Sequence, residues 1–118
     1  MLGWTPDEHL STVRVLLDEC LPAGLHRSLT DHEVTTVQRM GWAGTSNGAL
    51  LSLIEDAGFD AFLTVDKRLA LQQRIQGRQF GVIAMRAPSN DIADLVPLAP
   101  AILAALKTLS RGQFVQVG

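Results

Sequence analysis

Two segments of the chain are runs of strand-forming residues that lead directly to a carboxylate. The first, 13–17, ends at Asp18, and the second, 61–64, continues through Val65 to Asp66. Both runs are apolar enough to be buried strands of a parallel sheet. Because ligands gather at the carboxyl ends of strands in open α/β sheets, we expect the two aspartates to face each other there. Two carboxylates so placed repel each other, and a bound divalent cation is the best way to relieve that repulsion. This suggests a metal-dependent hydrolase that acts on phosphodiesters.

Each aspartate also has an alternative role as a helix cap. Asp18 could cap a helix that begins near Leu21, and Asp66 could cap a helix over 67–76. Glu19, beside Asp18, could reach the same edge of the sheet. Two acids at two strand ends favour a site, although phosphoacceptor and nucleotide-binding forms of such folds also carry acids there.

Other polar residues near the expected helix ends are weaker candidates. Asn47 opens an expected helix and is well placed to approach the two aspartates. Glu55 and Asp56 lie late in that helix, where the dipole disfavours acids, so we expect a solvated face. Asn90 and Asp91 follow a strand and could supply a further ligand, but capping the next helix is the favoured interpretation.

The histidines and the cysteine indicate no further chemistry. His9, His26 and His32 lack the spacing of a metal-binding motif. The single cysteine, Cys20, excludes an internal disulfide, and we expect it to be a structural small apolar residue rather than a nucleophile.

Strand-like and helix-like segments alternate along the chain, with turn residues between them. Strands are expected at 12–17, 33–37, 59–64, 80–85 and 113–117, the last at a sheet edge, and a loop is expected at 38–46. Helices are expected at 21–29, 46–57, 67–76 and 91–109, the last broken near Pro97 and Pro100. This alternation predicts an α/β protein with a small parallel sheet and helices on both faces.

The size and composition are those of one globular domain. The chain has 118 residues, of which 47% are hydrophobic and 19% charged, and we place a single domain at 12–118 after an extension at 1–11. The extension lacks the basic and apolar regions of a signal peptide, and no run approaches the roughly 20 apolar residues of a membrane span. We therefore expect a cytoplasmic protein that makes no use of a membrane.

The charge balance provides no general attraction for nucleic acid. The net charge is −2, so any contact with nucleic acid must come from a local patch. The candidates are Lys67, Arg68, Arg74 and Arg78, for which a solvated helix face is the favoured interpretation.

Several motifs together resemble a PIN-like family of small bacterial proteins. The segment 13–22, Val-Arg-Val-Leu-Leu-Asp-Glu-Cys-Leu-Pro, resembles the family's opening strand followed by Leu-Asp-Glu-Asn-Leu-Pro. The segments 31–34, 41–44 and 63–67 fall where the family has Gly-His-Asp-Val, a glycine-bearing loop and Thr-x-Asp-Lys. The resemblance covers nearly all of the chain from Val13 onward. It implies a three-layer α/β/α sandwich related to PIN-domain ribonucleases, including the VapC toxins of toxin–antitoxin pairs.

The resemblance also implies roles for individual residues. Asp18 and Asp66 would bind Mg²⁺ or Mn²⁺, with Glu19 and Asn47 assisting in the cleavage of RNA. The implied partners are an RNA substrate, an antitoxin protein and a second copy of the chain. A homodimer would use Trp42 if that side chain is exposed in the glycine-bearing loop.

The departures from the family pattern keep a second hypothesis open. Relatives carry an aspartate where this chain has Asn47, and an asparagine where it has Cys20. They also carry an acidic-aromatic pair at 68–69, which is Arg-Leu here. The missing charge at Asn47 favours the alternative of a weakened, non-catalytic PIN-like module that binds a protein partner or RNA. A flavodoxin-like receiver is a third option, but it requires a lysine that the last two expected strands lack.

Overall fold

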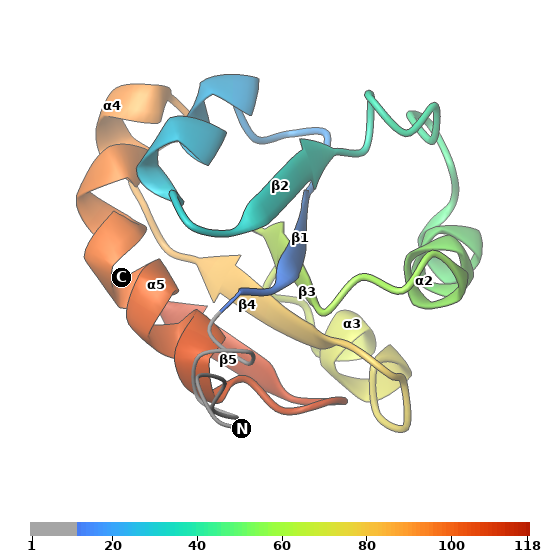
Figure 1. The fold of residues 1–118 in the computed structure, drawn as a ribbon. Helices are drawn as coiled ribbons and strands as arrows, with labels where there is room; N and C mark the ends of the chain where they lie inside the picture. The colour runs from blue at the N-terminus through green and yellow to red at the C-terminus, as the bar shows by residue number, and fades with distance from the viewer. Residues whose placement is uncertain (1–11) are drawn as a thin grey trace, which may run out of the picture.

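Five short strands form one all-parallel sheet in a computed structural model that describes residues 12–118 (Figure 1). In spatial order β2-β1-β3-β4-β5, they are β2 (Glu33–Thr36), β1 (Arg14–Leu17), β3 (Ala61–Thr64), β4 (Gly81–Met85) and β5 (Phe114–Val117). The predicted parallel sheet is confirmed, and all five expected strands form, with β2 and β5 at its edges. The expected extension at 1–11 lies outside the described residues.

Helices cover both faces of the sheet, which confirms the predicted three-layer α/β/α arrangement (Figure 1). One face carries η1 (Ala23–Ser28), α4 (Ile92–Leu95) and α5 (Ala99–Thr108), with η2 (Val96–Leu98) joining the last two. The other face carries α2 (Asn47–Asp56) and α3 (Leu69–Arg74). Within residues 12–118, no helix is both long enough and apolar enough to cross a membrane.

The two sides of the sheet bury separate apolar clusters. The cluster under η1, α4 and α5 includes Leu25, Leu63, Ile83, Leu95 and Ile102. The cluster under α2 and α3 includes Leu16, Leu51, Ile54, Phe62, Ile75, Phe80 and Val82. Strands β3 and β4 are buried along their whole length because both of their faces are covered, as is typical of parallel sheets.

Two of the expected helices differ from their predicted form. The segment predicted as a helix over 21–29 is a 3₁₀ helix over 23–28. The Leu25 and Leu29 amides donate to carbonyls three residues earlier in the chain, which is the hydrogen-bond spacing of a 3₁₀ helix. The helix predicted over 67–76 is only six residues long. It starts late because the Asp66 carboxylate accepts the Arg68 amide and keeps that residue extended. The break near Pro97 is confirmed, and Pro100 lies in the first turn of α5, where its missing N–H is tolerated.

Candidate functional site

The carboxyl ends of β1 and β3 bring Asp18 and Asp66 to the same edge of the sheet. The two strands are adjacent and parallel, with Leu17 paired to Leu63. After β1 the chain turns to one face of the sheet, and after β3 it turns to the other. Such a switch point is where open α/β sheets bind their ligands. The topology therefore places the two predicted residues where a functional site is expected.

The hydroxyl of Thr64 links the two aspartates. Thr64 Oγ1 donates to Asp18 Oδ2 at 2.7 Å and accepts the Asp66 amide at 3.0 Å. Thr64 is fully buried, while both aspartates are half-buried. One hydroxyl thus orients the Asp18 carboxylate and fixes the backbone at Asp66.

Asp18 belongs to the strand end and does not cap the following helix. Its amide donates to the Leu63 carbonyl at 2.9 Å, which adds one more rung to the pairing of β1 with β3. Its Oδ1 accepts the Glu19 amide at 2.8 Å. The N-cap of η1 is Pro22, with no side-chain cap, so the capping alternative for Asp18 is wrong.

The Asp66 carboxylate is held by Arg68. The Arg68 guanidinium donates to both carboxylate oxygens at 2.7–3.1 Å, and the Arg68 amide donates to Oδ1 at 2.9 Å. The hydrogen bonds from the Arg68 side chain are the main cause that lowers the pKa of Asp66, and they outweigh the opposing effect of desolvation. Asp66 is therefore a fully ionised carboxylate whose charge is balanced by an arginine. The alternative role of Asp66 as the cap of this helix is wrong, because the N-cap of α3 is Arg68 and no side chain caps it. The bond to the Arg68 amide instead shapes the turn before α3.

Glu19 contacts the loop that follows β2. Its Oε1 accepts the Gly44 amide at 3.3 Å, and its backbone carbonyl accepts Gln38 Nε2 at 2.8 Å. The side chain is thus directed toward the glycine-bearing loop. Glu19 supports this loop beside Asp18.

Asn47 is the exposed first residue of α2 and follows the N-cap residue Ser46. Within residues 12–118 it makes no side-chain hydrogen bond to Asp18, Glu19 or Asp66. Nor does that part of the chain contain a group of three or more His, Cys, Asp or Glu residues that could hold a metal ion. The candidate site therefore contains Asp18, whose carboxylate accepts a hydrogen bond from Thr64, and Asp66, whose backbone amide donates to the same hydroxyl. The metal-binding roles of these residues stay predictions.

Cys20 is exposed beside Asp18, so the structure does not use it as a small apolar residue of the core. Partial desolvation raises the pKa of the Cys20 thiol, and the negative charge of Asp18 raises it further. A thiol held in its neutral form is a poor nucleophile. Cys20 consequently adds no nucleophile to the site.

Two of the four residues of the predicted basic patch are paired with acids. Arg68 pairs with Asp66, and Arg78 Nη1 donates to Glu55 Oε1 at 3.0 Å. Glu55 also accepts the Gln79 amide at 2.9 Å, so it joins α2 to the segment before β4 and is not simply solvated as expected. The charge that this patch offers to nucleic acid is therefore reduced.

Trp42 does not provide the exposed dimer surface that was expected. It is half-buried, and its ring meets the ring of Phe59 edge-on at 6.1 Å between centroids. This contact anchors the loop after β2 to the core under α2. Packing within one chain is thus sufficient to account for the position of the Trp42 side chain.

Sequence reasoning missed Thr64 and Gln38, the two side chains that connect the acids to their surroundings. The threonine in a Thr-x-Asp segment at the end of a buried strand was a usable signal, because a buried hydroxyl needs a partner. Gln38 lies in a loop and carried no comparable signal.

No protein-family model, no curated protein and no solved structure matches this chain. The PIN-like resemblance therefore stays a hypothesis. The geometry of Asp18, Thr64 and Asp66 is the observation on which a function can be proposed.

Proposed function

We propose that the chain is a metal-dependent ribonuclease of PIN-like type, in which Asp18 and Asp66 hold one Mg²⁺ or Mn²⁺ ion. The proposal is supported by one observation: Asp18 and Asp66 follow the adjacent parallel strands β1 and β3, and Thr64 Oγ1 contacts the carboxylate of the first and the backbone amide of the second. The motif at 13–22 supports the same assignment. Glu19 and Asn47 assist from the loop after β1 and from the start of α2.

The donor set at this edge suits a single, largely hydrated ion. Mg²⁺ is typically bound by one or two carboxylates and keeps several water molecules, so two aspartates are a sufficient protein contribution. Arg68 has to leave Asp66 for the ion to bind. Its side chain is 67% exposed, and an exposed ion pair of this kind is weak because water screens it, so the exchange is feasible.

The residues around the ion have separate tasks. When bound, a divalent ion at this edge supplies an activated water molecule and stabilises the leaving oxygen of the cut strand. Thr64 keeps the Asp18 carboxylate in one orientation through its hydrogen bond. Arg68, once released from Asp66, is placed to bind a phosphate of the substrate.

The family resemblance extends the proposal to a biological setting. A ribonuclease of this type acts in the cytoplasm as the toxin of a toxin–antitoxin pair, with a small antitoxin protein as its partner. A neighbouring gene for a small DNA-binding protein would support this setting. Inhibition of RNA cleavage by that protein would test it directly.

A second candidate is a PIN-like module that binds RNA or a protein partner without catalysis. It is favoured by the bidentate Arg68–Asp66 pair, which already balances one of the two acids. The lack of a third acidic or histidine ligand within residues 12–118 also favours it.

An RNA cleavage assay distinguishes the two candidates. The wild-type protein is incubated with single-stranded RNA and Mn²⁺ or Mg²⁺, with and without a chelator, beside Asp18→Asn and the control Asp56→Asn. We expect metal-dependent cleavage that Asp18→Asn abolishes and Asp56→Asn, an exposed change on α2, leaves intact. Binding without cleavage supports the module. Cleavage that survives both chelation and Asp18→Asn eliminates the proposed site.

The role of Asn47 is tested by restoring the charge that the family pattern places there. We expect Asn47→Asp to tighten Mn²⁺ binding in calorimetry, because a carboxylate replaces a neutral amide ligand. Asn90→Asp, at an exposed position after β4, is the matched control. An affinity equal to that of wild type removes Asn47 from the metal site.

A further inference from the structure

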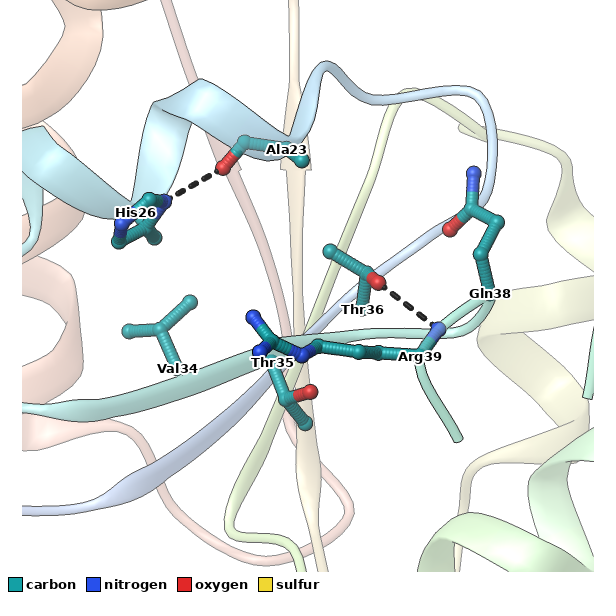
Figure 2. A pocket seen from close by; sticks show the side chains of 7 residues that line it. All are labelled: Ala23, His26, Val34, Thr35, Thr36, Gln38 and Arg39. Atoms are coloured by element: carbon teal, nitrogen blue, oxygen red, sulfur yellow. Dashed lines mark hydrogen bonds between the residues drawn. The ribbon is translucent and has the colours of Figure 1, made fainter. Parts of the chain in front are cut away.

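A cavity of about 410 Å³ lies beside the acidic edge, between η1 and the edge strand β2 (Figure 2). Its lining residues are Ala23, His26, Val34, Thr35, Thr36, Gln38 and Arg39. This volume is within the range of small-ligand pockets and suits one nucleotide unit. None of the metal-site candidates lines it, so the cavity is a separate feature of the molecule.

The charge of this cavity is opposite in sign to that of the chain as a whole. Its lining contains an arginine and a histidine and no carboxylate, whereas the net charge of the protein is −2. Within residues 12–118 the salt bridges join other partners, and the Arg39 guanidinium has no carboxylate within 4.0 Å. An arginine without an acidic partner at the wall of a cavity is suited to bind an anion.

Arg39 is positioned by the backbone turn that ends β2. Its amide donates to Thr36 Oγ1 at 3.0 Å, and its side chain runs back along β2 toward Val34 (Figure 2). His26 stands on the opposite wall, where its Nδ1 donates to the Ala23 carbonyl at 2.7 Å. The cavity thus combines a cationic group with the apolar surface of Val34 and the hydroxyl of Thr36.

Gln38 connects this cavity to the acidic edge. Its side chain lines the cavity, and its Nε2 donates to the backbone carbonyl of Glu19 at 2.8 Å. Glu19 is the residue next to Asp18. Gln38 therefore joins the wall of the cavity to the segment that follows β1.

We propose that the cavity between η1 and β2 binds one nucleotide of a single-stranded RNA, with Arg39 contacting its phosphate. The inference rests on the proposed function for the choice of RNA as the ligand, and it adds the place where the strand is held. Val34 and Ala23 provide apolar contact for the base, and Thr36 and Gln38 provide polar contact for the sugar.

Binding is measured without divalent ions, so that it reports on the cavity and not on a metal site. The probes are a short fluorescent oligouridylate in fluorescence anisotropy, and uridine 5′-monophosphate and uridine in calorimetry, all in the presence of a chelator. We expect Arg39→Gln to weaken oligouridylate binding roughly tenfold, the loss typical of one charge-assisted contact. Its salt dependence, log Kd against log salt concentration, should fall in slope by about 0.7, as for one phosphate contact to a single strand.

Two further variants control for indirect effects. Arg74→Gln removes an exposed arginine from α3, on the other face of the sheet, and should leave the affinity and the salt slope unchanged. Ala23→Trp fills the cavity from an exposed position of η1 and should weaken binding as much as Arg39→Gln does. Uridine, which lacks the phosphate, should bind equally to wild type and Arg39→Gln.

The outcomes separate this inference from the proposed function. If Arg39→Gln and Arg74→Gln reduce binding equally, or if Ala23→Trp has no effect, the cavity does not hold RNA, whatever the cleavage assay shows. If RNA binding depends on Arg39 but no metal supports cleavage, the cavity inference holds and the nuclease proposal fails.

Discussion

The hydroxyl of Thr64 donates a hydrogen bond to Asp18 Oδ2 at 2.7 Å, although the two residues are 46 positions apart in the chain. The donor is fully buried and the acceptor is half-buried. A hydroxyl in that position satisfies its own hydrogen-bonding need and orients the carboxylate at the same time. The pair therefore connects the stability of the β1–β3 junction to the geometry of the candidate site.

Replacing Thr64 by the isosteric valine tests this connection. We expect Thr64→Val to lower the free energy of unfolding by roughly 1–3 kcal/mol, because the half-buried Asp18 loses a hydrogen bond and so does the Asp66 amide. Thr64→Ser, which keeps the hydroxyl, should cost less. Urea unfolding of both variants measures the difference. Thr108→Val, at an exposed position of α5, is the control, and a Thr64→Val protein as stable as that control would contradict the assigned role.

The pKa of Asp66 should respond to Arg68. We expect Arg68→Gln to raise the pKa of the Asp66 carboxyl toward its ordinary value of 3.8, because the guanidinium hydrogen bonds are the main cause of its lowering. The folded-state pKa is depressed, so the stability contributed by the pair is present above pH 3.8 and is lost as the pH falls through the lower folded value. Since water screens this exposed pair, its contribution to stability is small.

Carboxyl NMR titration measures this shift. Lys67→Gln is the control, because the charge of Lys67 lowers the pKa of Asp66 less than any contact with Arg68 does. The unfolding free energies of wild type and Arg68→Gln should converge below the folded pKa. An unchanged Asp66 titration in Arg68→Gln would show that the ion pair is absent in solution.

The Cys20 thiol reports on the charge of Asp18. We expect Asp18→Asn to lower the pKa of Cys20, because the negative charge of Asp18 contributes to raising it. At a fixed pH below that pKa, iodoacetamide should then alkylate Cys20 faster in Asp18→Asn than in wild type. Glu19→Gln is a matched control, since Glu19 adjoins the cysteine without contributing to the shift. Equal acceleration by both variants would point to a local change in backbone structure instead.

Gly81 should tolerate no side chain, whereas Gly48 should. A Cβ atom at Gly81 would lie 2.5 Å from Leu109 Cγ and 2.8 Å from the Ser110 carbonyl oxygen. We therefore expect Gly81→Ala to destabilise by roughly 1–3 kcal/mol, the usual cost of overpacking. A Cβ at Gly48, in the first turn of α2, meets nothing within 4 Å, so Gly48→Ala should be neutral or stabilising by up to about 1 kcal/mol. Thermal unfolding compares the two, and equal midpoints would contradict the close approach of β4 to the segment at 109–110.

The fold could be predicted from the sequence because its strands are short apolar runs bounded by turn residues. Segments such as 61–64 and 81–85 are buried on both faces, and this leaves a pattern that needs no knowledge of tertiary contacts. Gly58, which follows α2, has a φ of +79°, in the left-handed region that glycine enters most readily. Features of this kind depend on neighbouring residues in the sequence, so they can be predicted without the tertiary structure.

For the site, the sequence could predict where Asp18 and Asp66 lie, but not which groups their carboxylates contact. The topology of a parallel sheet brings Asp18 and Asp66 to one edge, but the partners of each carboxylate depend on side-chain reach. Arg68, which the sequence pattern places in a basic patch, is for this reason the partner of Asp66 in the structure. The exposure of Cys20 has a related cause, since an apolar residue type does not reveal that the turn after β1 leaves it exposed.

The position of β1 inside the sheet has a consequence for how the protein is made. Val15 pairs with Val34 on one side and with Ala61 on the other, so the strand has its first partner early and its second only after a long stretch of chain. During synthesis, the β1–β2 unit therefore presents an unpaired apolar edge until β3 emerges, which slows folding and invites association with other nascent chains. This protein should consequently depend on holding chaperones at that stage more than a helical bundle of equal length.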